Sequence, residues 1–218
     1  MPPRAATPRA PAKINAQTAT PDLVLKGPPD SDKRAQLAQL FETVSVCTKC
    51  ALGSQRTQAV FGVGNYDADL MFIGEAPGAN EDRMGIPFVG NAGKLLTQEL
   101  EKNNIPRDDV FIANILKCRP PENRDPLPGE IEQCSPYLLQ QIDIIKPKLL
   151  CGLGRFACGL LMKQQIPIMK LRGTWSQYHG LPLFICLHPS AILHNPNNRE
   201  LFVQDIAQLA KTYHEKRQ

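Results

Sequence analysis

Four of the seven cysteines in this chain are placed like ligands of one metal centre. Cys47 and Cys50 form a Cys-x-x-Cys pair, and Cys118 and Cys134 follow much later in the chain. Thiolates bind soft metals, so four of them suit either a zinc ion or an iron–sulfur cluster, and the spacing does not separate the two. Alternatively, Cys118 and Cys134 are ordinary buried cysteines, since free cysteine is often buried. We expect all four to be metal ligands.

A second group of reactive residues lies where apolar runs end. Glu75, Asn114 and His188 each stand at or near the end of a run that predicts a buried strand. The carboxyl ends of parallel strands meet at one edge of a sheet, where ligands bind. A carboxylate can act as a base, a carboxamide both donates and accepts hydrogen bonds, and an imidazole can donate to a developing anion. We therefore expect the three side chains to line one cavity, although Asn114 and His188 taken singly also fit structural roles.

Alternating strands and helices are predicted around these residues. Short apolar runs predict buried strands, and amphipathic or helix-forming stretches separate them. This order favours an α/β fold, a three-layer α/β/α arrangement around a central four-stranded parallel sheet. The predicted strands are 70–73, 110–116, 148–153 and 183–187, and the predicted helices are 33 to about 44, 91–102, 129–145, 155–163 and 199–214.

Length and composition are those of one folded domain. The chain has 218 residues, of which 42% are hydrophobic, enough for a real core. It has neither an apolar run long enough to span a bilayer nor an apolar signal core, so we expect a cytoplasmic protein with reduced cysteines and no membrane partner. The net charge of +4 is compatible with a nucleic-acid partner without requiring one. Three further cysteines in apolar runs are predicted core residues: Cys151, Cys158 and Cys186.

Residues 1–32 differ in composition from the rest of the chain. They are rich in Pro, Ala and Thr, and Arg4, Arg9 and Lys13 precede the first acidic residue. This composition predicts a disordered, weakly basic tail, either a solvated linker or a segment that contacts a phosphate backbone or another protein. We therefore expect the folded domain at 33–218.

Several short motifs, in their order along the chain, are similar to those of one enzyme family. With the four cysteines, they resemble the iron–sulfur (family 4) uracil-DNA glycosylases over about 41–206. The motifs are Gly74-Glu75-Ala76-Pro77-Gly78, the segment from Gly85 through Pro87-Phe88-Val89-Gly90 to Leu96, Asn114 before Lys117-Cys118-Arg119-Pro120-Pro121, and His188-Pro189-Ser190.

The resemblance implies a uracil-DNA glycosylase-like fold and a structural [4Fe–4S] cluster held by Cys47, Cys50, Cys118 and Cys134. It implies hydrolysis of the N-glycosidic bond of deoxyuridine in single- or double-stranded DNA, which releases uracil and begins base excision repair. It further implies a monomer associated with a bacterial or archaeal nucleoid. The tail lies outside the resemblance, and its contact with another repair or replication protein is the alternative to a solvated linker.

The resemblance also assigns catalytic roles to three residues. Glu75 acts near the attacking water, either as a general base or by stabilising the sugar cation. Asn114 reads the edge of uracil, and His188 donates a hydrogen bond to a uracil carbonyl oxygen.

Further residues are implied to form the wall of the uracil pocket. Phe88 stacks on the flipped base, the backbone N–H of Ala76 contacts it, and Glu81 is a second acid in the pocket. Related glycosylases have a tyrosine where this chain has Gly78, so another group must exclude the methyl of thymine. We expect Glu81 or a nearby backbone segment to do so.

Two segments are expected to contact DNA outside the pocket. Gly93 and Lys94, at the start of a helix, are placed to hold a phosphate. Ser190, Leu193 and His194 belong to the loop that enters the duplex, where Leu193 acts as a wedge. The family often has arginine at position 194, so histidine there is a departure.

Three other functions were weighed. A related branch traps uracil-DNA covalently through a histidine in a basic loop, but the corresponding segment, 119–133, contains no histidine. A non-catalytic DNA-binding module with a structural metal would not need Glu75, Asn114 and His188 together. A zinc protein of unrelated function would lack the absorbance of an iron–sulfur centre.

Overall fold

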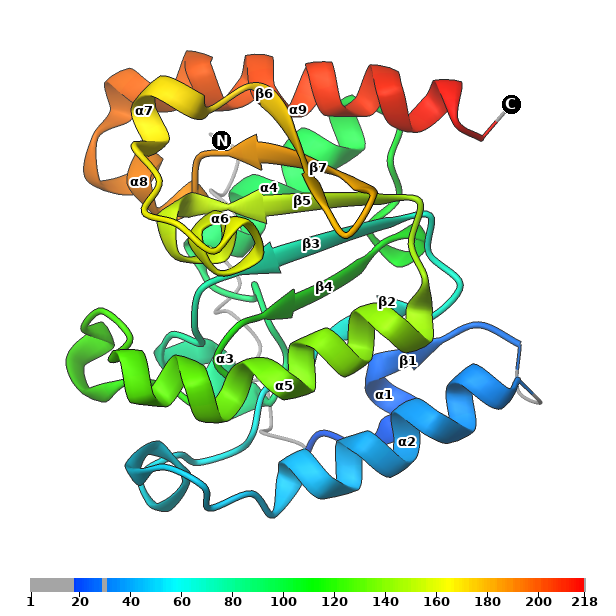
Figure 1. Cartoon of the computed structure of the whole chain (residues 1–218), viewed down its shortest axis with the longest axis vertical. Helices are drawn as coiled ribbons and strands as arrows, with labels where there is room; N and C mark the ends of the chain where they lie inside the picture. The colour runs from blue at the N-terminus through cyan, green and yellow to red at the C-terminus, as the bar shows by residue number, and fades with distance from the viewer. Residues whose placement is uncertain (1–17, 29–30, 218) are drawn as a thin grey trace, which may run out of the picture.

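The computed structural model describes residues 18–28 and 31–217, which form a seven-stranded mixed sheet covered on both faces by helices (Figure 1). The strand order is β1-β2-β4-β3-β5-β7-β6. The strands are β1 (Leu25–Lys26), β2 (Val63–Asn65), β3 (Leu70–Gly74), β4 (Phe111–Asn114), β5 (Leu149–Leu153), β6 (Thr174–Tyr178) and β7 (Leu181–Cys186).

The four predicted strands form the centre of this sheet. β4, β3, β5 and β7 are neighbours in that order and run parallel. The expected sheet of only four parallel strands is not confirmed, because β2 pairs antiparallel with β4 and β6 pairs antiparallel with β7. These outer strands lack the apolar run of a central strand: β2 is Val-Gly-Asn, and β6 is an edge strand with Thr174 and Trp175 exposed.

The predicted helices are confirmed to within a few residues at their ends. Because side chains alternate along each strand, Met71 and Ile73 face α2, α5 and α6, whereas Leu70 and Phe72 face α4, α8 and α9. Figure 1 shows α4 and α9 on one side of the sheet and α2 and α5 on the other. The helices are α1 (Pro21–Val24), α2 (Asp32–Ser45), α3 (Ala79–Met84), α4 (Asn91–Lys102), α5 (Pro128–Ile145), α6 (Gly154–Met162), α7 (Ile168–Leu171), α8 (Pro189–His194) and α9 (Arg199–Glu215).

The expected tail is ordered in the part that the structure describes. Val24 and Leu25 are buried in the core, and Leu25 pairs with Gly64 of β2. Two apolar side chains of an otherwise polar, Pro-rich segment therefore pack at the sheet edge, and the expected domain boundary at residue 33 stays a prediction. The basic residues expected to touch DNA or another protein lie in 1–17, outside the described residues.

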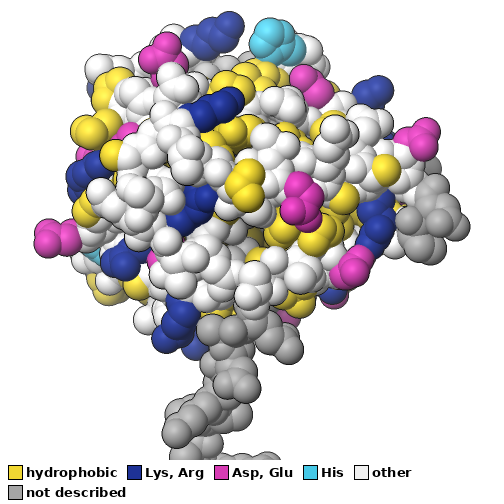
Figure 2. Space-filling model, turned by 90° about the horizontal axis from the view of Figure 1, so that it is seen from below, with side chains coloured by type: hydrophobic (Ala, Val, Ile, Leu, Met, Phe, Trp, Pro, Cys, Tyr) yellow, Lys and Arg dark blue, Asp and Glu magenta, His cyan; other side chains and the backbone are white. Residues whose placement is uncertain are grey.

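Charged side chains of both signs are interspersed on the face seen from below in Figure 2, and the basic ones do not gather into one patch there. This distribution agrees with the small net charge of +4. No helix within 18–28 and 31–217 is long and apolar enough to cross a membrane.

Candidate active site and cysteine cavity

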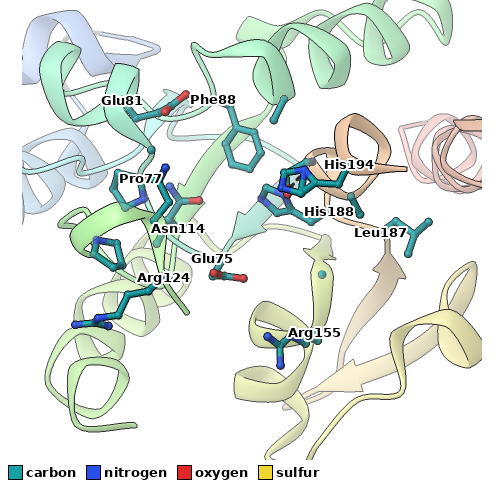
Figure 3. A pocket seen from close by; sticks show the side chains of 18 of the residues that line it. Glu75, Pro77, Glu81, Phe88, Asn114, Arg124, Arg155, Leu187, His188 and His194 are labelled. Carbon is teal, nitrogen blue, oxygen red and sulfur yellow. Dashed lines mark hydrogen bonds between the residues drawn. The ribbon is translucent and has the colours of Figure 1, made fainter. Parts of the chain in front are cut away.

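A cavity of about 570 Å³ opens at the carboxyl ends of the four central strands. Glu75 follows β3, Asn114 ends β4, Arg155 lies just after β5, and His188 lies just after β7. All four line this cavity, and Figure 3 shows the labelled side chains arranged around it. The structure therefore brings Glu75, Asn114 and His188 together, as the sequence predicts.

Asn114 presents an unsatisfied hydrogen-bond acceptor. Its side chain is almost fully buried, and its Oδ1 has no hydrogen-bond partner among the described residues. A Cβ at Gly74 would lie 2.4 Å from this oxygen and 2.7 Å from the ring of Phe88, so glycine lets the two side chains meet. A buried acceptor without a partner costs about 1–3 kcal/mol, which marks this oxygen as a place for a ligand donor.

The ring of Phe88 is held by a constrained loop. Phe88 has a φ of 54°, a left-handed conformation that is rare outside glycine. Arg107 donates to the carbonyl oxygens of Pro87 (3.0 Å) and Phe88 (3.1 Å). The Phe88 ring centroid lies 5.5 Å from that of His188. These contacts fix an aromatic ring beside the cavity, within reach of a planar ligand.

Gly93 supports this loop rather than standing at the surface. It is buried, and a Cβ there would lie 1.8 Å from the carbonyl oxygen of Phe88. Only glycine lets α4 approach the loop so closely, so Gly93 has a packing role here, and its expected phosphate contact stays a prediction.

Glu81 is a bound carboxylate rather than a solvated loop residue. Its Oε1 accepts hydrogen bonds from the backbone N–H groups of Val89 (2.9 Å) and Gly90 (2.7 Å), at the start of α4. A Cβ at Gly78 would lie 2.8 Å from Glu81 Oε2, so the absence of a side chain there lets the carboxylate reach the cavity wall. Glu81 thus both lines the cavity and orders the loop that carries Phe88.

The imidazole of His188 is neutral and oriented. Burial lowers its pKa to about 4. The backbone N–H of Ser190 donates to Nδ1 (3.2 Å), and Ser190 Oγ lies 2.7 Å from the same nitrogen. Because Nδ1 accepts, the proton of the neutral ring belongs on Nε2. His188 is therefore able to donate one hydrogen bond from Nε2.

Glu75 carries a carboxyl group that titrates near neutrality. Its pKa is raised to about 7, mainly by burial and also by the negative charge of Asp125, while the positive charge of Arg155 opposes the rise. Arg155 and Asp125 form a mostly exposed ion pair with a distance of 2.5 Å. A carboxyl group with a pKa near the working pH is suited to accept a proton during a reaction.

The remaining predicted contacts are divided between the cavity and the surface. Ala76, Ser190 and His194 line the cavity. Leu193 is 48% exposed at the end of α8, as a wedge would require, and Lys94 is exposed near the start of α4, outside the cavity lining. Sequence reasoning missed Arg155, although its place directly after the predicted strand 148–153 was a signal that could have found it.

The four candidate metal ligands line a second, smaller cavity. Cys47 and Cys50 lie beyond the end of α2, Cys118 follows β4, and Cys134 lies on α5. All four are free thiols in this structure. Sequence segments that are far apart therefore place four sulfur atoms around one space.

Three of these sulfur atoms accept hydrogen bonds. Cys118 accepts from Arg56 Nη1, Cys134 from the backbone N–H of Lys117, and Cys47 from the hydroxyl of Tyr137, each at 3.2 Å. Neutral thiol sulfur is a weak acceptor, whereas a metal-bound thiolate is a good one.

Burial raises the pKa of Cys118, and it raises that of Cys134 to about 11, so without a metal these groups are neutral thiols. Within the described part of the chain, no group of three or more His, Cys, Asp or Glu side chains is arranged to hold a single metal ion. The cavity offers four sulfurs and three hydrogen-bond donors to them, a set that suits a thiolate-bound metal centre.

Comparison with known proteins places the chain in a family. The model of the uracil DNA glycosylase superfamily matches residues 61–210. This chain therefore belongs to the uracil-DNA glycosylase superfamily.

Within it, the chain is similar to proteins named type-4 uracil-DNA glycosylase. It is 46% identical to that of Sulfurisphaera tokodaii, over 79% of this chain and 83% of the relative. It is 47% identical to that of Saccharolobus solfataricus, over 76% and 81%. It is 42% identical to that of Thermotoga maritima, over 79% and 93%.

Proposed function

We propose that this protein is a uracil-DNA glycosylase of the type-4 kind, which hydrolyses the N-glycosidic bond of deoxyuridine in DNA and leaves an abasic site. One observation carries the proposal: the unpartnered Asn114 Oδ1 lies beside the Phe88 ring, in a cavity that also contains Glu75 and His188. A planar base with an N–H group on its edge would satisfy that oxygen and pack against that ring.

Asn114 supplies the hydrogen-bond pattern that distinguishes uracil from cytosine. Uracil presents an N3–H donor beside its O4 acceptor, which complement the oxygen and the amide N–H of a carboxamide. Cytosine presents an acceptor at N3 and a donor at C4, so the same carboxamide would oppose it at both atoms. Stacking on Phe88 adds about 1–3 kcal/mol, and the backbone N–H of Ala76 is a further donor at the base.

His188 and Glu75 divide the charges of the reaction. The bond between C1′ of the sugar and N1 of the base breaks with its electron pair on uracil, and Nε2–H of His188 donates to the carbonyl oxygen that gains negative charge. The oxygen of a water molecule bonds to C1′, and the proton it releases passes to the carboxylate of Glu75. Because His188 is neutral, it stabilises the uracil anion without giving up its proton.

Glu81 is the group that we propose excludes thymine. The bare Gly78 leaves this carboxylate free to approach the cavity, where the related tyrosine would otherwise stand. A methyl group pressed against a hydrogen-bonded carboxylate would displace it from Val89 and Gly90, which gives thymine an energetic penalty.

We propose that the four cysteines that line the small cavity are the ligands of a [4Fe–4S] cluster: Cys47, Cys50, Cys118 and Cys134. When bound, the cluster joins two distant parts of the chain through its iron–thiolate bonds and plays a structural role. Arg56, Lys117 and Tyr137 would direct hydrogen bonds to three of the ligand sulfurs.

The proposed DNA surface lies around the mouth of the larger cavity. Lys94 and Ser190 would contact DNA phosphates. Leu193 would fill the space left by the flipped base, and His194 would contact the DNA strand next to that space. We propose that the enzyme acts as a monomer.

The function is tested with an oligonucleotide that contains a single uracil, followed by alkali to cut abasic sites. The purified protein should give one cut at the uracil without added metal, in single- and in double-stranded DNA, and none in matched strands with thymine or cytosine. No cut with any uracil substrate would refute the enzymatic proposal. A stable protein–DNA adduct in place of released uracil would favour the covalent trapping alternative.

A further inference from the structure

Lys117 lines the cysteine cavity, and only its backbone N–H, the donor to Cys134, has a role in the assignments above. It is 1% exposed, and no salt bridge joins it to a carboxylate in the described residues. Lysine is rarely buried in this way, because removing an ammonium group from water is costly unless hydrogen bonds compensate. An apolar side chain of similar length would fill the same space more cheaply, so packing alone does not explain a lysine here.

The ammonium group is held at the active-site end. Lys117 Nζ donates to the backbone carbonyl oxygen of Asn114 (2.9 Å) and to Oε1 of Gln141 (2.6 Å). Gln141 is itself fixed, since its Nε2 donates to the carbonyl oxygen of Phe61 (2.9 Å). The ammonium therefore anchors the last residue of β4, the residue whose side chain reads the base.

The backbone of Lys117 is held at the other end, beside the cysteines. Its N–H donates to the sulfur of Cys134 (3.2 Å), and its carbonyl oxygen accepts from the N–H of Val60 (2.7 Å). Any displacement of the cysteine cavity thus moves the Lys117 backbone, and through the side chain it moves the carbonyl of Asn114.

The segment between these two anchors also touches the backbone of Glu75. The N–H of Ile115 donates to the Gly74 carbonyl oxygen, and that of Leu116 donates to the Glu75 carbonyl oxygen, each at 3.0 Å. Residues 114–117 are thus a short hydrogen-bonded connection from the proposed cluster to the backbone of Asn114 and of Glu75.

We propose that Lys117 is a positioning residue that couples the base-reading Asn114 to the four-cysteine centre. The proposal rests on the proposed function, because it assigns a purpose to Asn114. Coupling of this kind is reciprocal: uracil bound at Asn114 protects the metal centre, and a change at Lys117 weakens uracil binding even when the centre is intact.

The test compares Lys117→Met with Arg56→Lys in the metal-loaded protein. Lys117→Met removes the ammonium and keeps the backbone bond to Cys134. Arg56→Lys changes a donor to Cys118 Sγ whose other contacts, the carbonyl oxygens of Cys47 and Ser45, lie away from the larger cavity. The measurements are iron per chain, affinity for free uracil by calorimetry, and the rate at which ferricyanide bleaches the visible absorbance with and without uracil.

Loss of one hydrogen bond at the base-reading strand end should weaken uracil binding in Lys117→Met by about tenfold, with wild-type iron content. Saturating uracil should slow bleaching of the wild type by about threefold or more, and this protection should disappear in Lys117→Met. Arg56→Lys should bleach faster, because a donor to Cys118 Sγ is changed, and it should keep the protection by uracil, because the Lys117 contacts are intact.

Wild-type uracil affinity and undiminished protection in Lys117→Met would overturn the coupling. If that variant does not fold, Gln141→Leu carries the test, because it removes one acceptor of Lys117 Nζ at a residue that does not line the cysteine cavity. It should show the same changes at smaller size. A wild-type protein that neither binds nor releases uracil would instead refute the proposed function itself.

Discussion

The two cavities of this molecule treat their polar atoms in opposite ways. Around the cysteines, three sulfurs each accept a hydrogen bond from a fixed donor. Around the strand ends, Asn114 Oδ1 has no partner in the described chain, and Phe88 holds an unfavourable φ of 54°. Unmet groups and backbone strain persist where a ligand will meet them, whereas satisfied groups contribute to stability. We infer that the cysteine cavity stabilises the fold and that the larger cavity at the strand ends binds the substrate and carries out the reaction.

The largest expected effect tests whether the cysteine cavity stabilises the fold, and it comes from removing one of the proposed metal ligands. Cys134→Ser should lose the absorbance at roughly 400 nm that thiolate–iron charge transfer produces. It should also lower the free energy of unfolding by more than about 3 kcal/mol, because the metal no longer joins two distant segments. Iron analysis, the visible spectrum and denaturant unfolding measure both effects.

Cys158→Ala is the matched control, since Cys158 is a buried free thiol that does not line the cysteine cavity. It should keep both colour and iron. Retained colour in Cys134→Ser would remove Cys134 from the ligand set.

The next largest effect is expected in the larger cavity, where a substitution at Asn114 should reduce activity without reducing stability. Asn114→Ala should reduce kcat/KM for uracil excision by about 100-fold to 1,000-fold, because the group that pairs with the base is lost. Its free energy of unfolding should stay the same or rise by about 1 kcal/mol, since a buried acceptor without a partner has been removed.

Asn114→Asp sharpens the same contrast, because it keeps the shape and exchanges the amide donor for a carboxylate oxygen. It should lose activity on uracil or gain activity on cytosine. Unchanged selectivity, or a large loss of stability in Asn114→Ala, would contradict the assignment of Asn114 as a binding group.

A smaller effect on activity is expected from Gly93, which packs against the backbone of the loop that carries the Phe88 ring. Gly93→Ala would place a Cβ 1.8 Å from the Phe88 carbonyl oxygen, so the loop must shift. Activity should fall by about 10-fold to 100-fold through misplacement of the ring, at a stability cost of about 1–3 kcal/mol. Gly129→Ala is the control, because a Cβ there meets nothing within 4 Å, and it should leave activity unchanged. Equal behaviour of the two variants would show that the ring position does not matter.

The sequence predicted the parts of the molecule that depend on local pattern. The central strands and the long helices follow from apolar runs and helical spacing, and the meeting of Glu75, Asn114 and His188 follows from their places at parallel strand ends. β1 and β6 were missed because an edge strand needs no apolar run. β2 was missed because its three residues, Val-Gly-Asn, form no apolar run either. The roles of Gly93 and Lys117 could not be predicted from the sequence. That of Gly93 depends on a close approach of two backbone segments, and that of Lys117 on a long side chain that reaches back to the end of β4.

The smallest expected effect concerns the charges beside Glu75, and its sign is the test. If catalysis needs the Glu75 carboxylate, activity should rise with pH through about 7, the pKa that burial gives this group. Asp125→Asn removes a negative charge that raises this pKa, so the acid limb of the pH–rate profile should move to lower pH. Arg155→Gln removes a positive charge that lowers it, so the limb should move to higher pH.

Each shift should be less than about one pH unit and should shrink at high salt, because the ion pair is mostly exposed. Shifts in the same direction for both variants would mean that the limb reports a group other than Glu75. Opposite shifts would show that an exposed ion pair at the cavity mouth adjusts a buried carboxylate.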